Sequence, residues 1–294
     1  MTRFGVLGTG YWADVCHASG IAAHPDAELV GIWGRDPAKT AALAAKHGVE
    51  AYAEVDGLFD DVDAVSLAVP PDVQVELAVQ AARAGCALLL EKPLALSADE
   101  ADRVAGEVDR AGVASVVFFT QRFAEPVDVW LREVGESDWD GGWGAFITTS
   151  LAANSPFSHS PWRREYGGLW DLAPHLLALV IPALGPVEES VAVQGRRDAM
   201  HLVLRHEGDR TSQITLTATA PAGAERLALE LWGPEGFSAA PLSNADVRRP
   251  YERAVAALIG AIESGVRHPC SVRFGAEVVH VIEAAAHQAP TVVA

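Results

Sequence analysis

The chain has 294 residues, half of them hydrophobic and 21% charged, so it is long enough for two globular domains. Its formal net charge of −17 argues against a nucleic-acid partner and against docking to anionic lipid, because both need a basic surface. The 3 cysteines show no CxxC spacing, which predicts neither disulfides nor a metal site and favours a cytoplasmic location. We expect no membrane partner, because no apolar run reaches the ~18–20 residues that cross a bilayer, and no signal peptide, because the chain enters a strand at once.

The N-terminal part of the chain alternates short apolar runs with alanine-rich segments of helical length. Continuous apolar runs of this kind are typical of parallel strands buried on both faces. The expected strands are Phe4–Leu7, Leu29–Trp33, Ala64–Val69, Ala87–Leu90 and Ser115–Phe119. Asp36-Pro37 is typical of a helix N-cap and first residue, and Ser97 with Glu100 is typical of a capping box. The β-α-β-α order predicts an α/β Rossmann domain with a doubly wound parallel sheet over residues 1–120.

After residue 120 the pattern changes to that of an α+β domain with a mainly antiparallel open sheet. The expected helices are Pro126–Val134, Gly168–Leu184, Tyr251–Ser264 and Gly275–His287. The expected strands are Gly144–Ala152, Glu189–Gln194, His201–His206, Thr211–Thr219 and Arg226–Trp232. Glu207-Gly208-Asp209 is a good hairpin turn between two of these strands. We assign this domain to residues 121–294 and leave open whether its last helix packs back on the first domain.

Gly8-Thr9-Gly10-Tyr11-Trp12-Ala13 forms a G-x-G-x-x-A fingerprint between the first strand and the first helix. In that position Gly8 permits a tight turn, and Gly10 lets the backbone approach a pyrophosphate. The helix that follows offers backbone N–H groups and a partial positive charge to the phosphates. The sequence therefore predicts a dinucleotide-binding turn.

The end of the second strand bears on the choice between NAD and NADP. An acidic residue there would bind the ribose 2′-hydroxyl, but Gly34 occupies the expected place. Arg35 is suited to a 2′-phosphate, and Asp36 is better used as a helix cap. We expect NADP, with NAD as the alternative if a one-residue shift lets Asp36 act as the acid.

Three further motifs point to a family: Ala68-Val69-Pro70-Pro71, Glu91-Lys92-Pro93-Leu94-Ala95, and the segment from Gly167 to His175. With the fingerprint, they resemble the glucose–fructose oxidoreductase and inositol dehydrogenase family over nearly the whole chain. The resemblance implies a Rossmann domain, an α+β domain often used for oligomerisation, and a nicotinamide cofactor. It also implies a sugar, polyol or keto-sugar substrate.

Residue by residue, the resemblance implies that Lys92, Asp171 and His175 are catalytic. Lys92 follows the fifth strand, where ligands of an open α/β sheet bind, and its ammonium is suited to polarise a substrate oxygen. Asp171 and His175 are one helical turn apart, and Pro174 indicates a helix that starts between Gly168 and Ala173. There Asp171 would orient the imidazole, and His175 would take or give the substrate proton as hydride moves to or from nicotinamide.

The candidate residues form two further sets. We expect the cofactor to contact Gly8, Thr9, Gly10, Tyr11, Trp12, Gly34, Arg35, Val69, Pro70, Glu91 and Lys92. We expect the substrate to contact Lys92, Gln121, Arg122, Trp162, Arg163, Asp171 and His175. Six tryptophans lie beyond residue 120, and their aromatic faces suit either sugar stacking or, more often, a core or interface.

Some residues depart from the family pattern and leave other functions open. Ala178 stands where many relatives have an aspartate, Ala173 where many have glycine, and Gln74 where a histidine is common. Those positions often touch substrate hydroxyls. The expected function is an NAD(P)-dependent dehydrogenase or reductase of CH–OH groups. The alternatives are a non-catalytic dinucleotide-binding sensor or assembly protein, and a glycoside-cleaving enzyme that keeps its cofactor tightly bound. We expect a homodimer or homotetramer that associates through the second sheet.

Overall fold

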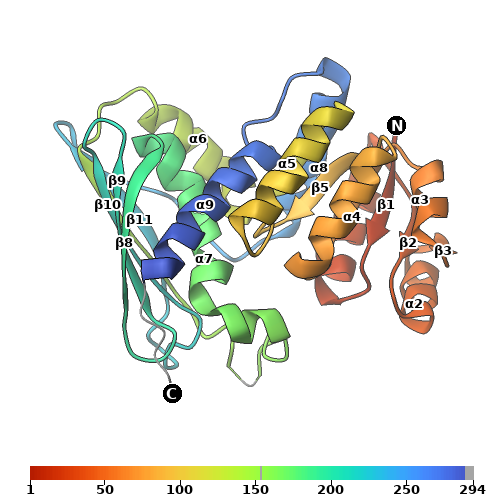
Figure 1. Cartoon of the computed structure of the whole chain (residues 1–294), viewed down its shortest axis with the longest axis horizontal. Helices are drawn as coiled ribbons and strands as arrows, with labels where there is room; N and C mark the ends of the chain where they lie inside the picture. The colour runs from red at the N-terminus through yellow and green to blue at the C-terminus, as the bar shows by residue number, and fades with distance from the viewer. Residues whose placement is uncertain (153, 289–294) are drawn as a thin grey trace. The chain divides into compact units, whose positions relative to one another are not determined.

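The computed structural model describes residues 1–152 and 154–288. The chain divides into two compact units (Figure 1). The first comprises Met1–Phe123 and Ala245–Glu277, and the second comprises Ala124–Asn244 together with the described residues 278–288. This division differs from the expected boundary after residue 120 mainly because residues 245–277 group with the first unit.

The first unit contains a six-stranded parallel sheet, as the sequence predicts. Its strands are β1 (Thr2–Leu7), β2 (Ala27–Trp33), β3 (Glu50–Tyr52), β4 (Ala64–Leu67), β5 (Ala87–Glu91) and β6 (Ser115–Phe118). The strand order is β3-β2-β1-β4-β5-β6, the doubly wound Rossmann order. The order reverses between β1 and β4, and at such a point a crevice opens beyond the carboxyl ends of the strands.

Helices connect these strands and pack on the sheet. They are η1 (Ala13–Ala18), α1 (Ser19–Ala23), α2 (Pro37–His47), α3 (Val55–Asp61), α4 (Pro71–Arg83), α5 (Ala98–Ala111), η2 (Thr120–Phe123) and α8 (Arg248–Ser264). Two predicted caps are confirmed. The Asp36 carboxylate accepts from the backbone N–H groups of Ala38 and Lys39, and the Ser97 hydroxyl accepts from the backbone N–H of Glu100. Strand β3, helix α3 and the π-helical turn η1 were not predicted from the sequence.

Helix α8 explains why a late segment joins the first unit. Its buried side chains, Tyr251, Ala254, Val255 and Leu258, follow the spacing of one helical face. That face packs against α1, η2, β5 and β6. Because the stripe covers apolar sheet residues that would otherwise face water, residues 245–277 complete the core of the first unit.

The second unit is built on a mixed, mainly antiparallel sheet, in agreement with the predicted fold class. Its strands are β7 (Gly141–Ile147), β8 (Val187–Gln194), β9 (Met200–His206), β10 (Thr211–Thr217), β11 (Arg226–Gly233) and β12 (Gly236–Ala239). The order is β12-β11-β7-β10-β9-β8, and among the described strands of this second sheet only the β7–β10 pair is parallel. Gly208 and Asp209 both have positive φ in the predicted hairpin turn between β9 and β10. The short strand β12 was not predicted.

Helix α7 (Pro161–Leu184) forms the core of the second unit, together with α6 (Glu125–Val134). Helix α9 (Val272–Gln288) ends the described chain. By length and composition alone α7 could cross a membrane, but 83% of its most apolar stretch is buried in the protein, as in a core helix. The helical segment after the break at Gly167 begins at Gly168, within the predicted range, and Pro174 lies in its second turn.

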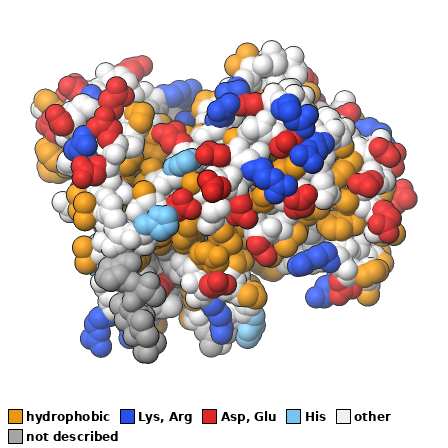
Figure 2. Space-filling view, viewed as in Figure 1, with side chains coloured by type: hydrophobic (Ala, Val, Ile, Leu, Met, Phe, Trp, Pro, Cys, Tyr) orange, Lys and Arg blue, Asp and Glu red, His pale blue; other side chains and the backbone are white. Residues whose placement is uncertain are grey.

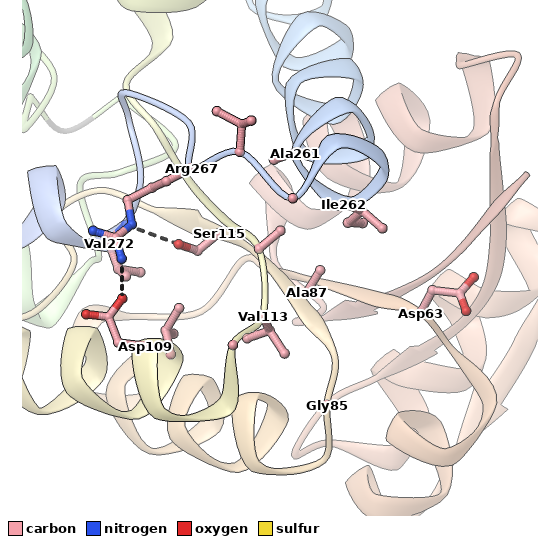
Figure 3. Close-up of a pocket in the computed structure, with 15 residues that line it drawn as sticks. Asp63, Gly85, Ala87, Asp109, Val113, Ser115, Ala261, Ile262, Arg267 and Val272 are labelled. Carbon is pink, nitrogen blue, oxygen red and sulfur yellow. Dashed lines mark hydrogen bonds and ion pairs between the residues drawn. The ribbon is translucent and has the colours of Figure 1, made fainter.

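A cavity of about 380 Å³ lies at the amino ends of β4, β5 and β6 (Figure 3). This edge is opposite to the carboxyl ends of the strands, where the fingerprint lies. Its lining includes Asp63, Ala87, Asp109, Ser115, Ile262 and Arg267. None of the predicted site residues lines this cavity. Acidic and basic side chains are interspersed on the molecular face seen in Figure 2.

Candidate active site

The first glycine of the fingerprint is fixed by a close backbone approach. Gly8 has φ +130°, and its N–H donates to the carbonyl of Trp33 over 2.8 Å. A Cβ at this position would lie 2.4 Å from the carbonyl oxygen of Ala68. The turn from β1 into the helix is therefore locked between the ends of β2 and β4, and no other residue type fits there.

The second glycine leaves open space at the start of the helix. A Cβ added to Gly10 would meet no atom within 4 Å, and the neighbouring Tyr11 side chain is 58% exposed. Helical structure begins at Tyr11, so N–H groups of the first turn lie at this opening. An open, glycine-lined helix N-terminus fits the pyrophosphate of a nicotinamide dinucleotide, which needs close backbone approach and positive partial charge.

At the end of β2, Gly34 lies against the fingerprint turn and Asp36 caps a helix, as predicted for Asp36. A Cβ at Gly34 would lie 2.6 Å from Cγ2 of Thr9, so the end of β2 packs directly on the fingerprint turn. Asp36 is occupied as the N-cap of α2. Arg35 is exposed beside them. Thr9, Gly34 and Arg35 thus share the edge at which the fingerprint lies, and no acidic side chain follows β2 until the cap.

The Gln74 side chain fixes the backbone of the Glu91-Lys92-Pro93 turn through hydrogen bonds. The Gln74 amide is fully buried on α4. Its Nε2 donates to the carbonyls of Glu91, Pro93 and Leu94, and its Oε1 accepts from the N–H of Glu91. Lys92, which precedes a cis peptide bond to Pro93, is 9% exposed. Gln74 therefore holds the backbone that presents Lys92.

Two of the predicted cofactor residues bond to each other. Nε1 of Trp12 donates to Oε1 of Glu91 over 2.6 Å, and the backbone N–H of Lys92 donates to Oε2 over 3.2 Å. His17 lies 3.0 Å from the same Oε1. Sequence reasoning missed His17, although its position on the helix that follows the fingerprint was a usable signal. The Glu91 carboxylate thus joins the fingerprint helix to the Lys92 turn.

The other first-unit candidates are placed as follows. Val69 and Pro70 follow β4 at the same edge, and Pro70 is the N-cap residue of α4. The hydrogen bond from Ala68 N to Leu7 O extends the β1–β4 pairing up to this point. Gln121 and Arg122 lie in η2, where Gln121 is buried and Arg122 is partly exposed. One unit therefore brings the predicted cofactor residues to the carboxyl edge of one sheet.

In the second unit, Asp171 and His175 lie just after a break in α7. Gly167 adopts φ 65° and ψ −164°, and a second helical segment begins at Gly168, at the early limit of the predicted start. A Cβ at Gly168 would lie 3.1 Å from Oδ2 of Asp198 and 3.3 Å from the Thr217 backbone, so the segment starts directly against β10. Asp171 is 5% exposed, and the ring of His175 packs edge-on against Phe146.

Arg163, which is predicted to contact substrate, bonds to the predicted catalytic aspartate. Its Nε donates to Oδ1 of Asp171 over 3.1 Å. Its guanidinium also lies 4.7 Å from the ring centre of Phe157 and 4.5 Å from that of Trp162. The side chain predicted to contact substrate is thus a partner of the predicted catalytic aspartate.

Most of the second-half tryptophans belong to the core, as the more frequent interpretation predicts. The buried ones are Trp130, Trp139, Trp162 and Trp170. Trp143 and Trp232 are 39% and 41% exposed on the sheet. Among residues 1–152 and 154–288, no group of three or more His, Cys, Asp or Glu side chains is arranged to hold a metal ion.

The comparisons with known proteins agree with this geometry. Residues 2–119 match the oxidoreductase family with an NAD-binding Rossmann fold. Over these residues the chain is similar to that family. The chain is 27% identical to the inositol 2-dehydrogenase of Rhizobium meliloti over 81% of this chain and 75% of that protein. It is 32% identical to the UDP-N-acetylglucosamine 3-dehydrogenase of Acidithiobacillus ferrooxidans over 45% of this chain and 41% of that protein.

A solved structure shares the fold of the chain over both units. The scyllo-inositol dehydrogenase of Lactobacillus casei, solved with NAD(H) and scyllo-inositol, superposes with a TM-score of 0.85. The match covers 98% of this chain and 96% of that one at 16% identity. At this identity the likeness shows that the two proteins share a fold.

Proposed function

We propose that this protein is an NAD(P)-dependent dehydrogenase or reductase that acts on a CH–OH group of a sugar, polyol or keto-sugar. The observation that carries the proposal is the meeting of the fingerprint, the Trp12–Glu91 bond and buried Lys92 at one edge of the parallel sheet. The sugar and polyol dehydrogenases among its relatives support the substrate class.

Each candidate residue has a chemical role in this proposal. The bound nicotinamide supplies a hydride acceptor or donor. The Lys92 ammonium polarises the substrate oxygen and stabilises its alkoxide character. His175 takes the hydroxyl proton in oxidation and returns it in reduction. Asp171 would orient the His175 imidazole from one helical turn away, and Arg163 keeps the Asp171 carboxylate in place.

A coupled panel experiment tests the proposal. The purified protein is mixed with NAD or NADP and with inositols, hexoses, nucleotide sugars and simple glycosides, and absorbance in the nicotinamide band is followed. Net cofactor reduction on a polyol or sugar supports the dehydrogenase. Cleavage of a glycoside without net cofactor change contradicts it in favour of the glycoside-cleaving alternative. Dinucleotide binding with no turnover on any compound contradicts it in favour of a sensor.

We further propose that NADP is preferred over NAD. Gly34 leaves no carboxylate beside the ribose 2′-position, Asp36 is used as a cap, and exposed Arg35 is suited to a 2′-phosphate. Fluorescence titration should give a lower Kd for NADPH than for NADH, and Arg35→Ala should remove most of the difference. Lys39→Ala, which removes another exposed cation on α2, is the matched control. Equal or tighter binding of NADH by the unaltered protein would reject this preference.

We also propose that the second sheet pairs with another copy of this chain. Large apolar side chains on its uncovered face are Val191, Val193, Val203, Trp143, Trp232 and Phe237, which are 39–74% exposed. Cross-strand register makes several of them neighbours, because Val191 lies opposite Val203 and Trp232 opposite Phe237. Exposed apolar side chains that adjoin one another in this way are typical of a protein–protein interface, whereas scattered single ones are not.

Sedimentation velocity tests this surface. The unaltered protein should sediment as a dimer or tetramer, and Val203→Glu should shift it toward the monomer. Val266→Glu, which alters an even more exposed valine of the first unit, should leave the assembly unchanged. A monomeric unaltered protein would contradict the proposed interface.

A further inference from the structure

A chain of fully buried polar side chains runs through the first unit beneath the fingerprint turn. The Tyr251 hydroxyl on α8 bonds to the Ser66 hydroxyl on β4. Ser66 Oγ lies 2.7 Å from Nδ1 of His17, and Nε2 of His17 lies 3.0 Å from Oε1 of Glu91. Tyr251, Ser66 and His17 are each 0% exposed. Three elements far apart in sequence thus connect to one carboxylate at the sheet edge.

The groups at the two ends of this series of side chains determine which partner donates in each hydrogen bond. The Glu91 carboxylate can only accept, so His17 donates to Oε1 from Nε2, beside the Trp12 indole that donates to the same oxygen. The neutral imidazole then accepts at Nδ1 from the Ser66 hydroxyl. Ser66 in turn accepts from Tyr251, whose pKa burial raises well above its usual value and which therefore keeps its proton.

The chain ends at the residue that joins the two cofactor-facing turns. His17 lies in η1, the π-helical turn one step beyond the fingerprint, and such turns are often found at functional sites. Trp12 and His17 come from the same helix and bond to the same oxygen of Glu91. The other oxygen accepts from the N–H of Lys92, and Gln74 fixes the backbone below. Removal of His17 would leave the carboxylate with fewer buried donors and more rotamers.

We propose that His17 is a positioning residue for the dinucleotide site. Set in one tautomer by Ser66 and Tyr251, it holds the Glu91 carboxylate so that the fingerprint helix and the Lys92 turn form one rigid wall for the cofactor. The inference rests on the proposed function for the ligand, but the tautomer of His17 can be measured without any ligand. The effect on binding comes from preorganisation, because the cofactor does not have to order this wall when it binds.

The first measurement is of the ligand-free protein. Nitrogen-15 NMR of the histidine side chains should show His17 protonated at Nε2 and unprotonated at Nδ1. Tyr251→Phe, which removes only the hydroxyl, should perturb the His17 nitrogens although it lies two hydrogen bonds away. The opposite tautomer in the unaltered protein would overturn the proposal, whether or not the protein proves to bind a dinucleotide.

The second measurement is of dinucleotide affinity. His17→Leu should raise the Kd for NADPH or NADH by about tenfold, as expected for a buried bond to a charged group. His17→Gln retains a donor and an acceptor and should recover the affinity to within about threefold. Cys16→Ala is the control, because Cys16 is as buried as His17 but does not belong to the hydrogen-bonded series Tyr251–Ser66–His17–Glu91. This variant should leave the Kd unchanged. Thermal unfolding of each variant separates loss of fold from loss of affinity.

A double-mutant cycle decides whether His17 acts through Glu91. In a Glu91→Ala background, His17→Leu should cause no further rise in Kd, because the carboxylate that it positions is gone. Independent effects that multiply in the double variant would overturn the proposal. An unchanged Kd in His17→Leu alone would overturn it too, even with a lowered Tm, since His17 would then be structural only. If the unaltered protein binds neither dinucleotide, the proposed function fails, and the role of His17 at a cofactor site fails with it.

Discussion

Arg163 and Asp171 form a largely buried ion pair across the break in α7, with Nε and Oδ1 3.1 Å apart. The pair joins the segment before Gly167 to the helix that carries the candidate catalytic residues. Phe157 and Trp162 flank the guanidinium and limit the directions in which it can turn. Asp171 is therefore held in place by a side chain that precedes it by two helical turns.

Arg163→Met should reduce turnover by at least about tenfold and the free energy of unfolding by about 2 kcal/mol, because it leaves a buried carboxylate without this partner. Steady-state kinetics and urea unfolding provide the measurements. Arg164→Met is the matched control, because the neighbouring Arg164 is exposed and its Nε donates to the Ser158 carbonyl rather than to Asp171. Equal losses in the two variants would show that the Asp171 contact has no special role.

Substitution of the two fingerprint glycines by alanine should have different effects on stability. Gly8→Ala should lower the free energy of unfolding by about 3 kcal/mol, because its φ is unfavourable and its Cβ would strike the Ala68 carbonyl. Gly10→Ala has room for a Cβ, so unfolding should change by less than about 0.5 kcal/mol.

The same pair separates fold from ligand binding. In Gly10→Ala the added methyl occupies the open space at the helix start, and the dinucleotide Kd should rise by about tenfold or more. Unfolding curves and fluorescence titration on both variants provide the comparison. Unchanged affinity in Gly10→Ala would place the pyrophosphate somewhere other than this turn.

Lys92→Ala should lower turnover by about a hundredfold or more while dinucleotide binding persists, because the ammonium is assigned to the reacting oxygen and not to the phosphates. Stopped-flow or steady-state kinetics combined with a binding titration measures the two effects separately. Lys39→Ala, at an exposed lysine on α2, should change neither quantity by much. Retained turnover in Lys92→Ala would remove this residue from the mechanism.

The buried His206 should make the second unit sensitive to mild acid. Its Nδ1 bonds to the Gly185 carbonyl and its Nε2 to the Ser212 hydroxyl, and burial lowers its pKa below the ordinary value. A lowered pKa in the folded state means that the unfolded chain binds the proton more readily. The stability that neutral His206 contributes is therefore present above its ordinary pKa and is lost as the pH falls through and below that value.

We expect the free energy of unfolding to fall between about pH 7.5 and about pH 5.5, and the fall to be smaller in His206→Asn. Urea unfolding at a series of pH values measures both slopes. His201→Asn is a suitable control, because His201 is exposed on the same strand and bonds only to the Thr215 hydroxyl among the described residues. Parallel slopes for the unaltered protein and His206→Asn would contradict the assignment.

The parts of the site that depend on local chemistry could be predicted from the sequence. A tight turn needs Gly8 whatever lies around it, and Asp36 next to proline caps a helix through its own neighbours. The alternation of apolar runs likewise predicts the parallel sheet, because it reports burial on both faces.

The parts that depend on contacts between distant residues could not be predicted. Ser66 and Tyr251 bond across 185 positions of sequence, and no periodicity signals such a pair. No sequence pattern indicates that the Gln74 amide bonds to the backbone of the Lys92 turn, 17 to 20 residues further along the chain. In the sequence Arg163 has the pattern of a solvated cation in a loop. Its ion pair with Asp171 forms across the helix break at Gly167, and this contact could not be predicted from spacing.

The first unit is assembled from two separate stretches of the chain, Met1–Phe123 and Ala245–Glu277. During synthesis on the ribosome, the nascent N-terminal stretch therefore emerges long before α8, which covers β5 and β6 and supplies Tyr251. All six strands of the sheet lie in that first stretch, but the apolar core that covers β5 and β6 can be completed only after the intervening unit has been made. A truncation after residue 123 would accordingly yield an incomplete nucleotide domain with exposed apolar surface, prone to aggregation, rather than a minimal binding module.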